Sequence, residues 1–412
     1  MFVMRAAGVL LVAALALGAG AAVLASGSRG PALIPASSPG SGSVASRWIA
    51  APRHVGTAEV ACDLGRARFS SRGWRTDFGR CSVPLEEFRG GGPGRDGIPP
   101  IDRPQFQTVA PADAWLKPRE PVVFLEISGD ARAYPLQVLI WHEIVNDQVG
   151  GQPVAVTFCP LCNTAIAFDR RIEGHTLDFG TTGNLRLSDL VMWDRQTESW
   201  WQQATGEAVV GELTGTRLQL LPARIISWAE FREQRPQGRV LSRETGHRRD
   251  YGRNPYVGYD DISQSPFLFE GPSDGRLRPM ERVVTVSLDG EHVAYPVSAL
   301  RDHGVVADRV GGRAIVVFFQ PGTASALDLS DIASSRDVGS AGVYAAELEG
   351  RDLSFTWNGS AFVDRETGSR WTILGQATAG PLADSQLEPM VHVDAFWFAT
   401  AAFLPQVRVW SP

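Results

Sequence analysis

The sequence contains one Cys-x-x-Cys motif, Cys159-Pro160-Leu161-Cys162, which directly follows the apolar run Val154–Phe158. Two cysteines at this spacing can hold one metal ion or interconvert between a dithiol and a disulfide. The apolar run predicts a buried strand, and the junction of a strand with a loop is a rigid platform for a site. The motif is therefore the first candidate for a functional site.

A metal site is one of three interpretations of this motif. Two thiolates and an imidazole form a soft ligand set that suits copper or zinc, and His142 is the nearest candidate for the third ligand. Met192 is a further soft donor, although a core methionine is the simpler interpretation. We expect three polar residues near His142 to surround and tune the ligands: Glu143, Asn146 and Asp147.

Two other interpretations stay open for Cys159 and Cys162. The motif resembles the redox centre of thioredoxin-fold proteins, where the first thiolate lies at a helix N-terminus. The following residues, 163–174, form a short β-like run and no long amphipathic helix, so the thioredoxin fold itself is not expected. The third interpretation is a local disulfide or a pair of inert thiols in a non-catalytic binding or structural module with a cleft between two copies.

Those two copies are an internal repeat. Residues 122–160 and 283–321 align without a gap, and 16 of the 39 positions are identical. The match resumes further on, where Asp194, Trp201 and Trp228 correspond to Asp364, Trp371 and Trp397. A tandem duplication therefore organises most of the chain.

The duplication separates residues needed by the shared fold from residues found in one copy only. His142 and Asp147 persist in the second copy as His303 and Asp308, which is typical of structural residues. The second copy lacks both cysteines of the motif and has no counterpart of two neighbouring polar residues, Glu143 and Asn146. The second copy is therefore interpreted as a degenerate, structural half.

The pattern of short apolar runs predicts a mainly β or α+β fold, with a barrel-like unit as one option. The first copy is expected to begin with a two-stranded ribbon at 122–136, turned at Ser128-Gly129-Asp130. A helical turn at 138–144 and a Gly-Gly turn at 150–151 follow, and then come strands at 154–158, 165–168, 176–179 and 190–194. An amphipathic helix at 228–234 closes the unit.

The chain divides into six predicted segments. Residues 1–25 read as a secretory signal peptide or an uncleaved membrane anchor, because a short basic start precedes an apolar run and a small-x-small site. Residues 26–50 form a Ser-, Gly- and Pro-rich linker, and 51–120 form an irregular segment that packs on the first repeat. The first repeat covers 121–242, a connection covers 243–281, and the second repeat covers 282–412.

The predicted location is extracytoplasmic, with a possible membrane tether through the N-terminus. In an oxidising compartment, Cys62 and Cys81 are expected to form a structural disulfide. The net charge of −6 and the pI near 5.7 argue against nucleic acid as a partner. The sequence identifies no protein partner.

Three weaker candidates accompany the cysteine motif. The polar loop 183–189 could shape the mouth of a pocket, and Trp200-Trp201 could bind a ring, although core packing explains two tryptophans more simply. The charged segment 249–253 lies in the connection, where loops often carry function. No Gly-rich phosphate loop, HExxH motif or serine nucleophile elbow occurs in the sequence.

Several of these motifs together resemble the domain-of-unknown-function 3179 family. The resemblance is close over about residues 74–260 and looser over the second copy. The family has no established activity, so the resemblance implies no function. The segments that carry the resemblance are TDFGRCSVPLEEF, GGGPGRDGIPPID, ARAYPLQVLIWHEIVND, TFCPLCNTAIAFDR, LVMWDRQTESWWQQATGEAVVG and RDYGRNPY.

Overall fold

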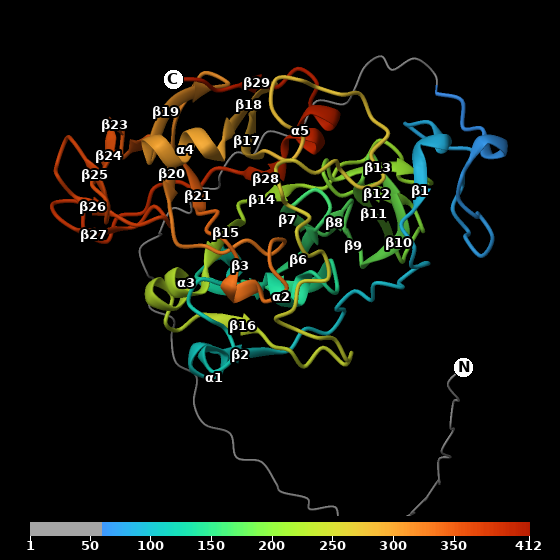
Figure 1. Cartoon of the computed structure of the whole chain (residues 1–412), viewed down its shortest axis with the longest axis horizontal. Coiled ribbons are helices and arrows are strands. Elements are labelled where there is room, and N and C mark those ends of the chain that lie inside the picture. Colours follow the sequence, from blue (N-terminus) through green and yellow to red (C-terminus); the bar gives the residue numbers. More distant parts are fainter. Residues whose placement is uncertain (1–59) are drawn as a thin grey trace, which may run out of the picture. The chain divides into compact units, whose positions relative to one another are not determined.

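The computed structural model describes residues 60–412 (Figure 1). The expected export segment at 1–25 and the linker at 26–50 lie outside the described residues. The described part is built mainly from short strands, as the sequence predicted. Its helices are few and short: α1 (Val109–Asp113), α2 (Leu136–Leu139), α3 (Trp228–Gln234), α4 (Val297–His303), α5 (Trp397–Phe403), and the 3-10 turns η1 (Leu64–Arg66), η2 (Leu85–Glu87) and η3 (Ile332–Ser334).

The first half of the chain contains three larger sheets. One has the order β15 (Arg224–Ser227), β3 (Pro121–Ile127), β4 (Asp130–Pro135), β16 (Arg239–Leu241) and β2 (Phe106–Thr108). The next has the order β14 (Leu220–Leu221), β7 (Thr164–Asp169), β6 (Gln152–Cys159) and β5 (Ile144–Val149). The third has the order β1 (Phe88–Gly90), β10 (Phe179–Arg186), β11 (Asp189–Asp194), β12 (Trp200–Gln202) and β13 (Glu207–Val210), and a small ribbon pairs β8 (Arg171–Ile172) with β9 (His175–Thr176).

The second half has sheets of corresponding strand order. The first contains β28 (His392–Phe396), β17 (Arg282–Leu288), β18 (Glu291–Pro296) and β29 (Arg408–Val409). The second contains β19 (Val305–Val310), β20 (Arg313–Gln320) and β21 (Ser340–Ala345). The third contains β24 (Phe355–Trp357), β25 (Phe362–Asp364), β26 (Arg370–Trp371) and β27 (Ala377–Ala379), and a ribbon pairs β22 (Glu347–Leu348) with β23 (Arg351–Asp352).

Local sequence explains the sharpest turns. Gly150 and Gly151 join β5 to β6 with φ of 54° and 82°, and a Cβ on Gly150 would lie 2.2 Å from the Ile127 carbonyl oxygen. Only glycine fits such a position.

Helix α3 starts with a capping box, in which the Ser227 hydroxyl accepts from the Glu230 N–H and the Glu230 carboxylate accepts from the Ser227 N–H.

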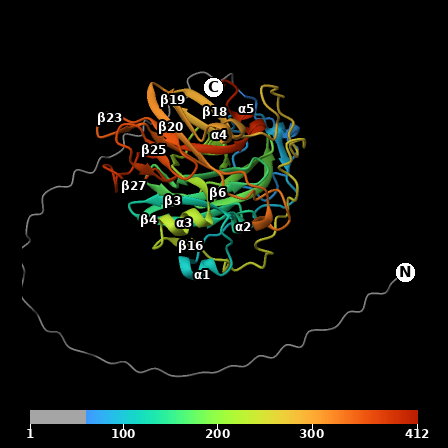
Figure 2. The ribbon, with the colours of Figure 1, turned by 60° about the vertical axis from the view of Figure 1, so that its left-hand side comes forward.

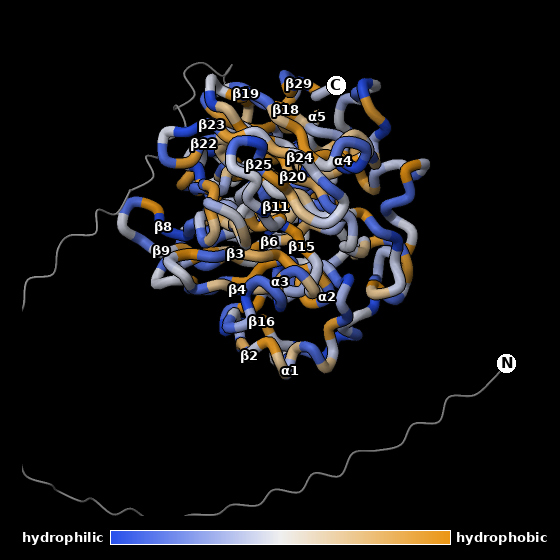
Figure 3. The backbone as a smooth tube through the Cα atoms, turned by 90° about the vertical axis from the view of Figure 1, so that its left-hand side faces the viewer, coloured by the Kyte–Doolittle hydropathy of each residue, from blue (hydrophilic) through white to orange (hydrophobic). Residues whose placement is uncertain are grey.

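The two halves pack closely against each other in Figures 1 and 2, where the orange and red elements lie along the green and cyan ones. Strand β28 of the second half contacts β7 of the first, and β15 of the first contacts β21 of the second. Hydrophobic residues concentrate along the inner strands, such as β15 and β20, and hydrophilic residues along the surface loops (Figure 3). Each half therefore supplies part of the other's core.

The structure tests the expected barrel and the expected disulfide. The sheets described between residues 60 and 412 are open, so the barrel-like option was wrong. Cys62 and Cys81 form the expected disulfide. In addition, no helix in the described part of the chain combines the length and the hydropathy that crossing a bilayer requires.

Candidate functional site

The Cys-x-x-Cys motif forms the turn of the β6–β7 hairpin. Cys159 ends β6 and pairs with Thr164, the first residue of β7, so the turn contains the four residues between them. Asn163 closes the turn with a left-handed φ of 53°, a conformation that asparagine tolerates better than most residues. The turn faces the interior, because Cys159 is 1% and Cys162 0% exposed.

Both halves of the chain hold this turn in place. The Tyr259 hydroxyl donates to the Leu161 carbonyl at 3.0 Å, and the Phe396 N–H of β28 donates to the Cys162 carbonyl at 2.8 Å. The Gln203 side chain links the two strands, since its amide donates to Thr157 Oγ1 at 2.9 Å and its carbonyl accepts from Thr164 Oγ1 at 2.8 Å. The thiols are thus fixed by strands, a side-chain bridge and the second half.

A third acidic group, Asp189, completes a compact cluster with the thiols. The Cys159 and Cys162 sulfurs and an Asp189 carboxylate oxygen all lie within 4.8 Å of one another. Asp189 begins β11 after a turn in which Leu187 and Ser188 have left-handed φ values of 52° and 64°. Such a turn normally takes Asn-Gly, so two ordinary residues are held there under strain.

One oxygen of Asp189 is committed to the fold and the other is not. Oδ2 accepts from Gln202 Nε2 at 2.5 Å and from the Ala204 N–H at 2.9 Å. Oδ1 is fully buried and accepts no hydrogen bond from a nitrogen or hydroxyl group of residues 60–412, and the neighbouring Cys162 and Cys159 thiols help to lower the pKa of the carboxyl group. A buried carboxylate is costly to ionise, so Asp189 offers the two thiols a third potential ligand group that a cation would stabilise.

The same burial disfavours negative charge throughout the cluster. Burial raises the pKa of Asp189 to about 6 and the pKa values of both thiols above their ordinary range. Glu143 is 7% exposed, and its burial, together with the charge of Asp189, raises its pKa to about 8. Four acidic groups therefore share an interior region in which burial, the largest cause for each of them, disfavours the ionised forms.

Glu143 lies beside this cluster in a strained conformation. Its φ is +60°, its N–H donates to the Leu139 carbonyl at 2.7 Å, and its own carbonyl accepts from the Phe158 N–H at 2.8 Å. The last bond ties Glu143 to the strand that ends at Cys159. Its carboxyl group is not one of the atoms within 4.8 Å of both sulfurs and Asp189. Glu143 is therefore a neighbour of the cluster, and its carboxyl group is not a fourth potential ligand.

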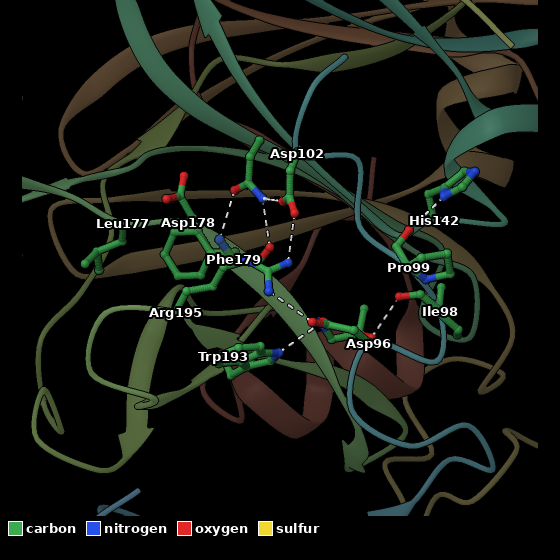
Figure 4. Close-up of polar contacts among 12 residues, drawn as sticks. Asp96, Ile98, Pro99, Asp102, His142, Leu177, Asp178, Phe179, Trp193 and Arg195 are labelled. Atoms are coloured by element: carbon green, nitrogen blue, oxygen red, sulfur yellow. Dashed lines mark hydrogen bonds and ion pairs between the residues drawn. The ribbon is translucent and has the colours of Figure 1, made fainter. Parts of the chain in front are cut away.

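The structure does not bring His142 into the cluster, which corrects the ligand set expected from the sequence. His142 Nδ1 lies 2.7 Å from the Pro99 carbonyl oxygen, and Nε2 lies 2.7 Å from the Tyr251 hydroxyl (Figure 4 shows the contact with Pro99). A carbonyl oxygen can only accept, so Nδ1 carries the proton and Nε2 accepts from Tyr251. Both nitrogens are used, and burial lowers the pKa of His142 to about 4.

Asn146 and Asp147 also serve the fold rather than the thiols. Asn146 donates to Asp102 and to the Phe179 carbonyl, each at 2.8 Å. Asp147 accepts from the Tyr134 hydroxyl at 2.6 Å and pairs with Arg132 at 2.9 Å. The second half repeats this contact between Tyr295 and Asp308 at 2.9 Å, which explains why the aspartate persists there.

The weaker candidates from the sequence also divide into residues of the core and one residue of the site. Met192 and Trp200 are core residues, and the Trp201 indole donates to Asp194 at 2.9 Å. The polar loop 183–189 leads to Asp189, so it contributes to the site through its last residue. Cys159 and Cys162 are free thiols in the structure, and the local disulfide left open by the sequence is not formed.

Comparison with known proteins places the chain in a family. A family model described as a protein of unknown function, DUF3179, matches residues 95–407. The chain belongs to the DUF3179 family. No curated protein and no solved structure matches it. The match covers both halves and every residue of the cluster, so the cluster lies within the region that defines this DUF3179 member.

Asp189 is the functional candidate whose role sequence reasoning missed. The duplication of the chain provides the signal that points to Asp189. The pairs Phe179–Asp194 and Phe355–Asp364 close corresponding hairpins, which span 16 and 10 residues respectively (194 − 179 + 1 and 364 − 355 + 1). The six extra residues of the first hairpin carry the strained turn that positions Asp189. A comparison of hairpin lengths would have identified Asp189 as specific to the first copy, as the cysteines are.

Proposed function

We propose that this protein acts outside the cytoplasm as a metalloprotein with one zinc ion held by Cys159, Cys162 and Asp189. The observation that carries the proposal is the buried Asp189 carboxylate, one oxygen of which lies with the Cys159 and Cys162 sulfurs in a group of potential ligand atoms within 4.8 Å of one another. The Cys62–Cys81 disulfide supports the location, since such bonds persist in oxidising compartments.

Electrostatics favours a cation at this cluster. Buried charges are normally paired or bound to metal, because taking a charge out of water is expensive. A divalent cation would stabilise the thiolates and the Asp189 carboxylate in their ionised forms and so reverse the raised pKa values of the free groups. Zinc suits this mixed set better than copper(I), because zinc accepts both thiolate and carboxylate ligands and copper(I) prefers sulfur.

Three protein ligands point to a catalytic rather than a structural zinc site. Structural zinc sites use four protein ligands, whereas catalytic ones use three and keep one position for water or substrate. Glu143 lies next to the cluster and has a pKa near physiological pH, which is the property of a general acid or base. We assign Glu143 the transfer of protons to and from a water or substrate at that open position.

A dithiol redox centre explains fewer of the observations. Thiol–disulfide exchange requires a thiolate that a partner can reach. Burial keeps both thiols neutral, and neither sulfur is exposed enough for attack by a second protein.

The test is the metal content of the exported protein and its variants, measured by elemental analysis. We expect about one zinc per chain in the wild type and a nearly complete loss in Cys159→Ser and Cys162→Ser. Asp189→Asn should weaken zinc binding by more than about 10-fold, since even partners outside the ligand shell contribute about 10–100-fold. His142→Gln is the matched control and should keep its zinc. A wild-type protein without metal, or a Cys159→Ser variant that retains it, contradicts the proposal.

A further inference from the structure

A cavity of the described chain is lined by Ile140 and Trp141, which shortly precede Glu143 in the chain. It has a volume of about 490 Å³, within the usual range of small-molecule sites. Three segments form its walls: 93–98, the turn that contains Ile140 and Trp141, and the connection at 248–256. The last of these contains RDYGRNPY, a motif that the proposed zinc centre does not use.

Two walls of the cavity lead to the zinc cluster. Trp141 precedes Glu143 by two residues in the chain. On the wall formed by the connection, the Tyr256 ring lies 6.5 Å from that of Tyr259, and the Tyr259 hydroxyl donates to the Leu161 carbonyl of the cysteine turn. The charges of Glu143 and Cys159 also contribute to the raised pKa of the Tyr256 phenol, after its burial. Tyr256 therefore belongs to the cavity wall and also lies within electrostatic range of Glu143 and Cys159.

The cavity walls are anchored to the fold rather than loose. The segment at 93–98 is held by Asp96, which accepts from Trp193 Nε1 at 3.1 Å and pairs with Arg195 at 3.1 Å (Figure 4). The connection is held by Tyr251, whose hydroxyl lies 2.7 Å from His142 Nε2. This gives His142 a second role, because one ring positions both walls through Pro99 and Tyr251.

The chemistry of the lining selects an anion. Arg248 and Arg249 line the cavity and are exposed, and neither forms an ion pair with a carboxylate of residues 60–412. The one acid in the lining, Asp250, pairs instead with Arg253 at 3.9 Å. Guanidinium groups recognise carboxylates and phosphates, and Trp141 and Tyr256 add flat aromatic surface beside them.

We infer that this cavity binds the substrate of the zinc centre, a small molecule with a carboxylate or phosphate attached to an apolar or aromatic body. The anionic group contacts Arg248 and Arg249, and the body lies along Trp141 and Tyr256 toward Glu143. That the bound molecule is a substrate rests on the proposed function. The anion site itself depends only on the cavity and its two arginines.

The test is calorimetric titration of the purified protein with benzoate, phenyl phosphate and the uncharged benzyl alcohol. We expect at least one anion to bind more tightly than benzyl alcohol, and a comparison of the two anions identifies the preferred group. The double variant Arg248→Ala/Arg249→Ala should weaken that binding by more than about 10-fold, as expected for lost hydrogen bonds to a charged group. Arg278→Ala is the control, because Arg278 is an exposed arginine that does not line the cavity and forms no ion pair within residues 60–412.

Two results overturn the inference: equal binding of the anions and benzyl alcohol to the wild type, or equal binding of the anion to the double variant and the wild type. Zinc content is measured on the same samples. Zinc without anion binding contradicts only the cavity's role, whereas anion binding without zinc contradicts only the proposed metal centre.

Discussion

Glu143 occupies the left-handed backbone position that Gly304 occupies in the second half of the chain. The φ values are +60° and +69°, and both residues accept a hydrogen bond at 2.8 Å from the corresponding strand, Phe158 in one half and Phe319 in the other. The backbone conformation at this position therefore favours glycine. The first half instead holds a buried glutamate there, and strain of this kind concentrates at functional sites.

Replacing Glu143 by glycine should stabilise the metal-free protein. The change removes backbone strain worth about 1–3 kcal/mol and a buried carboxyl group. The free energy of unfolding in urea at pH 8 should rise, while the zinc content should stay near one per chain. Glu143→Gln, which keeps the strain but cannot ionise, separates the two contributions. A Glu143→Gly variant less stable than the wild type would show that the glutamate serves the fold.

The stability of the metal-free protein should fall as the pH rises from about 4.5 to about 8. The unfolded chain loses the Glu143 proton near pH 4.5, whereas the folded chain retains it up to about pH 8. Between these values the unfolded state binds fewer protons, so the free energy of unfolding decreases, by on the order of 5 kcal/mol for this shift. Urea titrations at several pH values after chelation measure the change.

The Glu143→Gln variant should have a flatter pH profile over the same range. Asp189 contributes a smaller decrease between about pH 3.8 and 6, because its pKa is raised in the same direction. Zinc should remove the decrease, since the metal favours deprotonated ligands. A wild-type profile as flat as that of the variant would refute the burial of an ionisable Glu143.

The Cys62–Cys81 disulfide should stabilise the chain by about 3 kcal/mol, the chain-entropy value for a loop of this length. Its cysteines are 19 positions apart, and Cys81 packs on the cluster around Trp200. The double variant Cys62→Ser/Cys81→Ser should unfold at correspondingly lower urea and keep its zinc. Loss of zinc together with a native unfolding midpoint would instead link this disulfide to the site.

His142→Phe should destabilise the fold without removing the metal. The variant leaves the Pro99 carbonyl without its donor, at about 1–3 kcal/mol, whereas the Tyr251 hydroxyl loses one partner and keeps Thr245 Oγ1 at 2.6 Å. Binding of anions in the cavity should weaken, because both walls lose their common anchor. Elemental analysis and the titrations described above measure the two effects. Loss of zinc from a folded variant would restore His142 as a ligand.

Local patterns in the sequence predicted much of the fold. The Gly-Gly turn at 150–151, the strand before Cys159 and the helix Trp228–Gln234 depend on nearby residues, and the structure has all three. The predicted helical turn at 138–144 was placed too late, because α2 ends at Leu139 and β5 begins at Ile144. Glu143, which has a left-handed φ, lies between α2 and β5. A glutamate in the sequence does not predict such a conformation.

The candidate site was predicted only in part, because its parts come from distant strands. Proximity along the chain favoured His142 as the third ligand, but its ring turns toward Pro99 and Tyr251. Asp189 lies 27 residues beyond Cys162 and reaches the thiols through the pairing of β10 with β11. Long-range packing of that kind is not encoded in any local pattern.

The ligand set of the zinc ion is the central claim, and X-ray absorption at the zinc edge tests it most directly. The account predicts two sulfur neighbours at about 2.3 Å and oxygen neighbours at about 2.0–2.2 Å. It also predicts no imidazole scattering, and one sulfur fewer in Cys162→Ser reloaded with zinc. A spectrum with an imidazole ligand, or with fewer than two sulfurs in the wild type, would contradict the account.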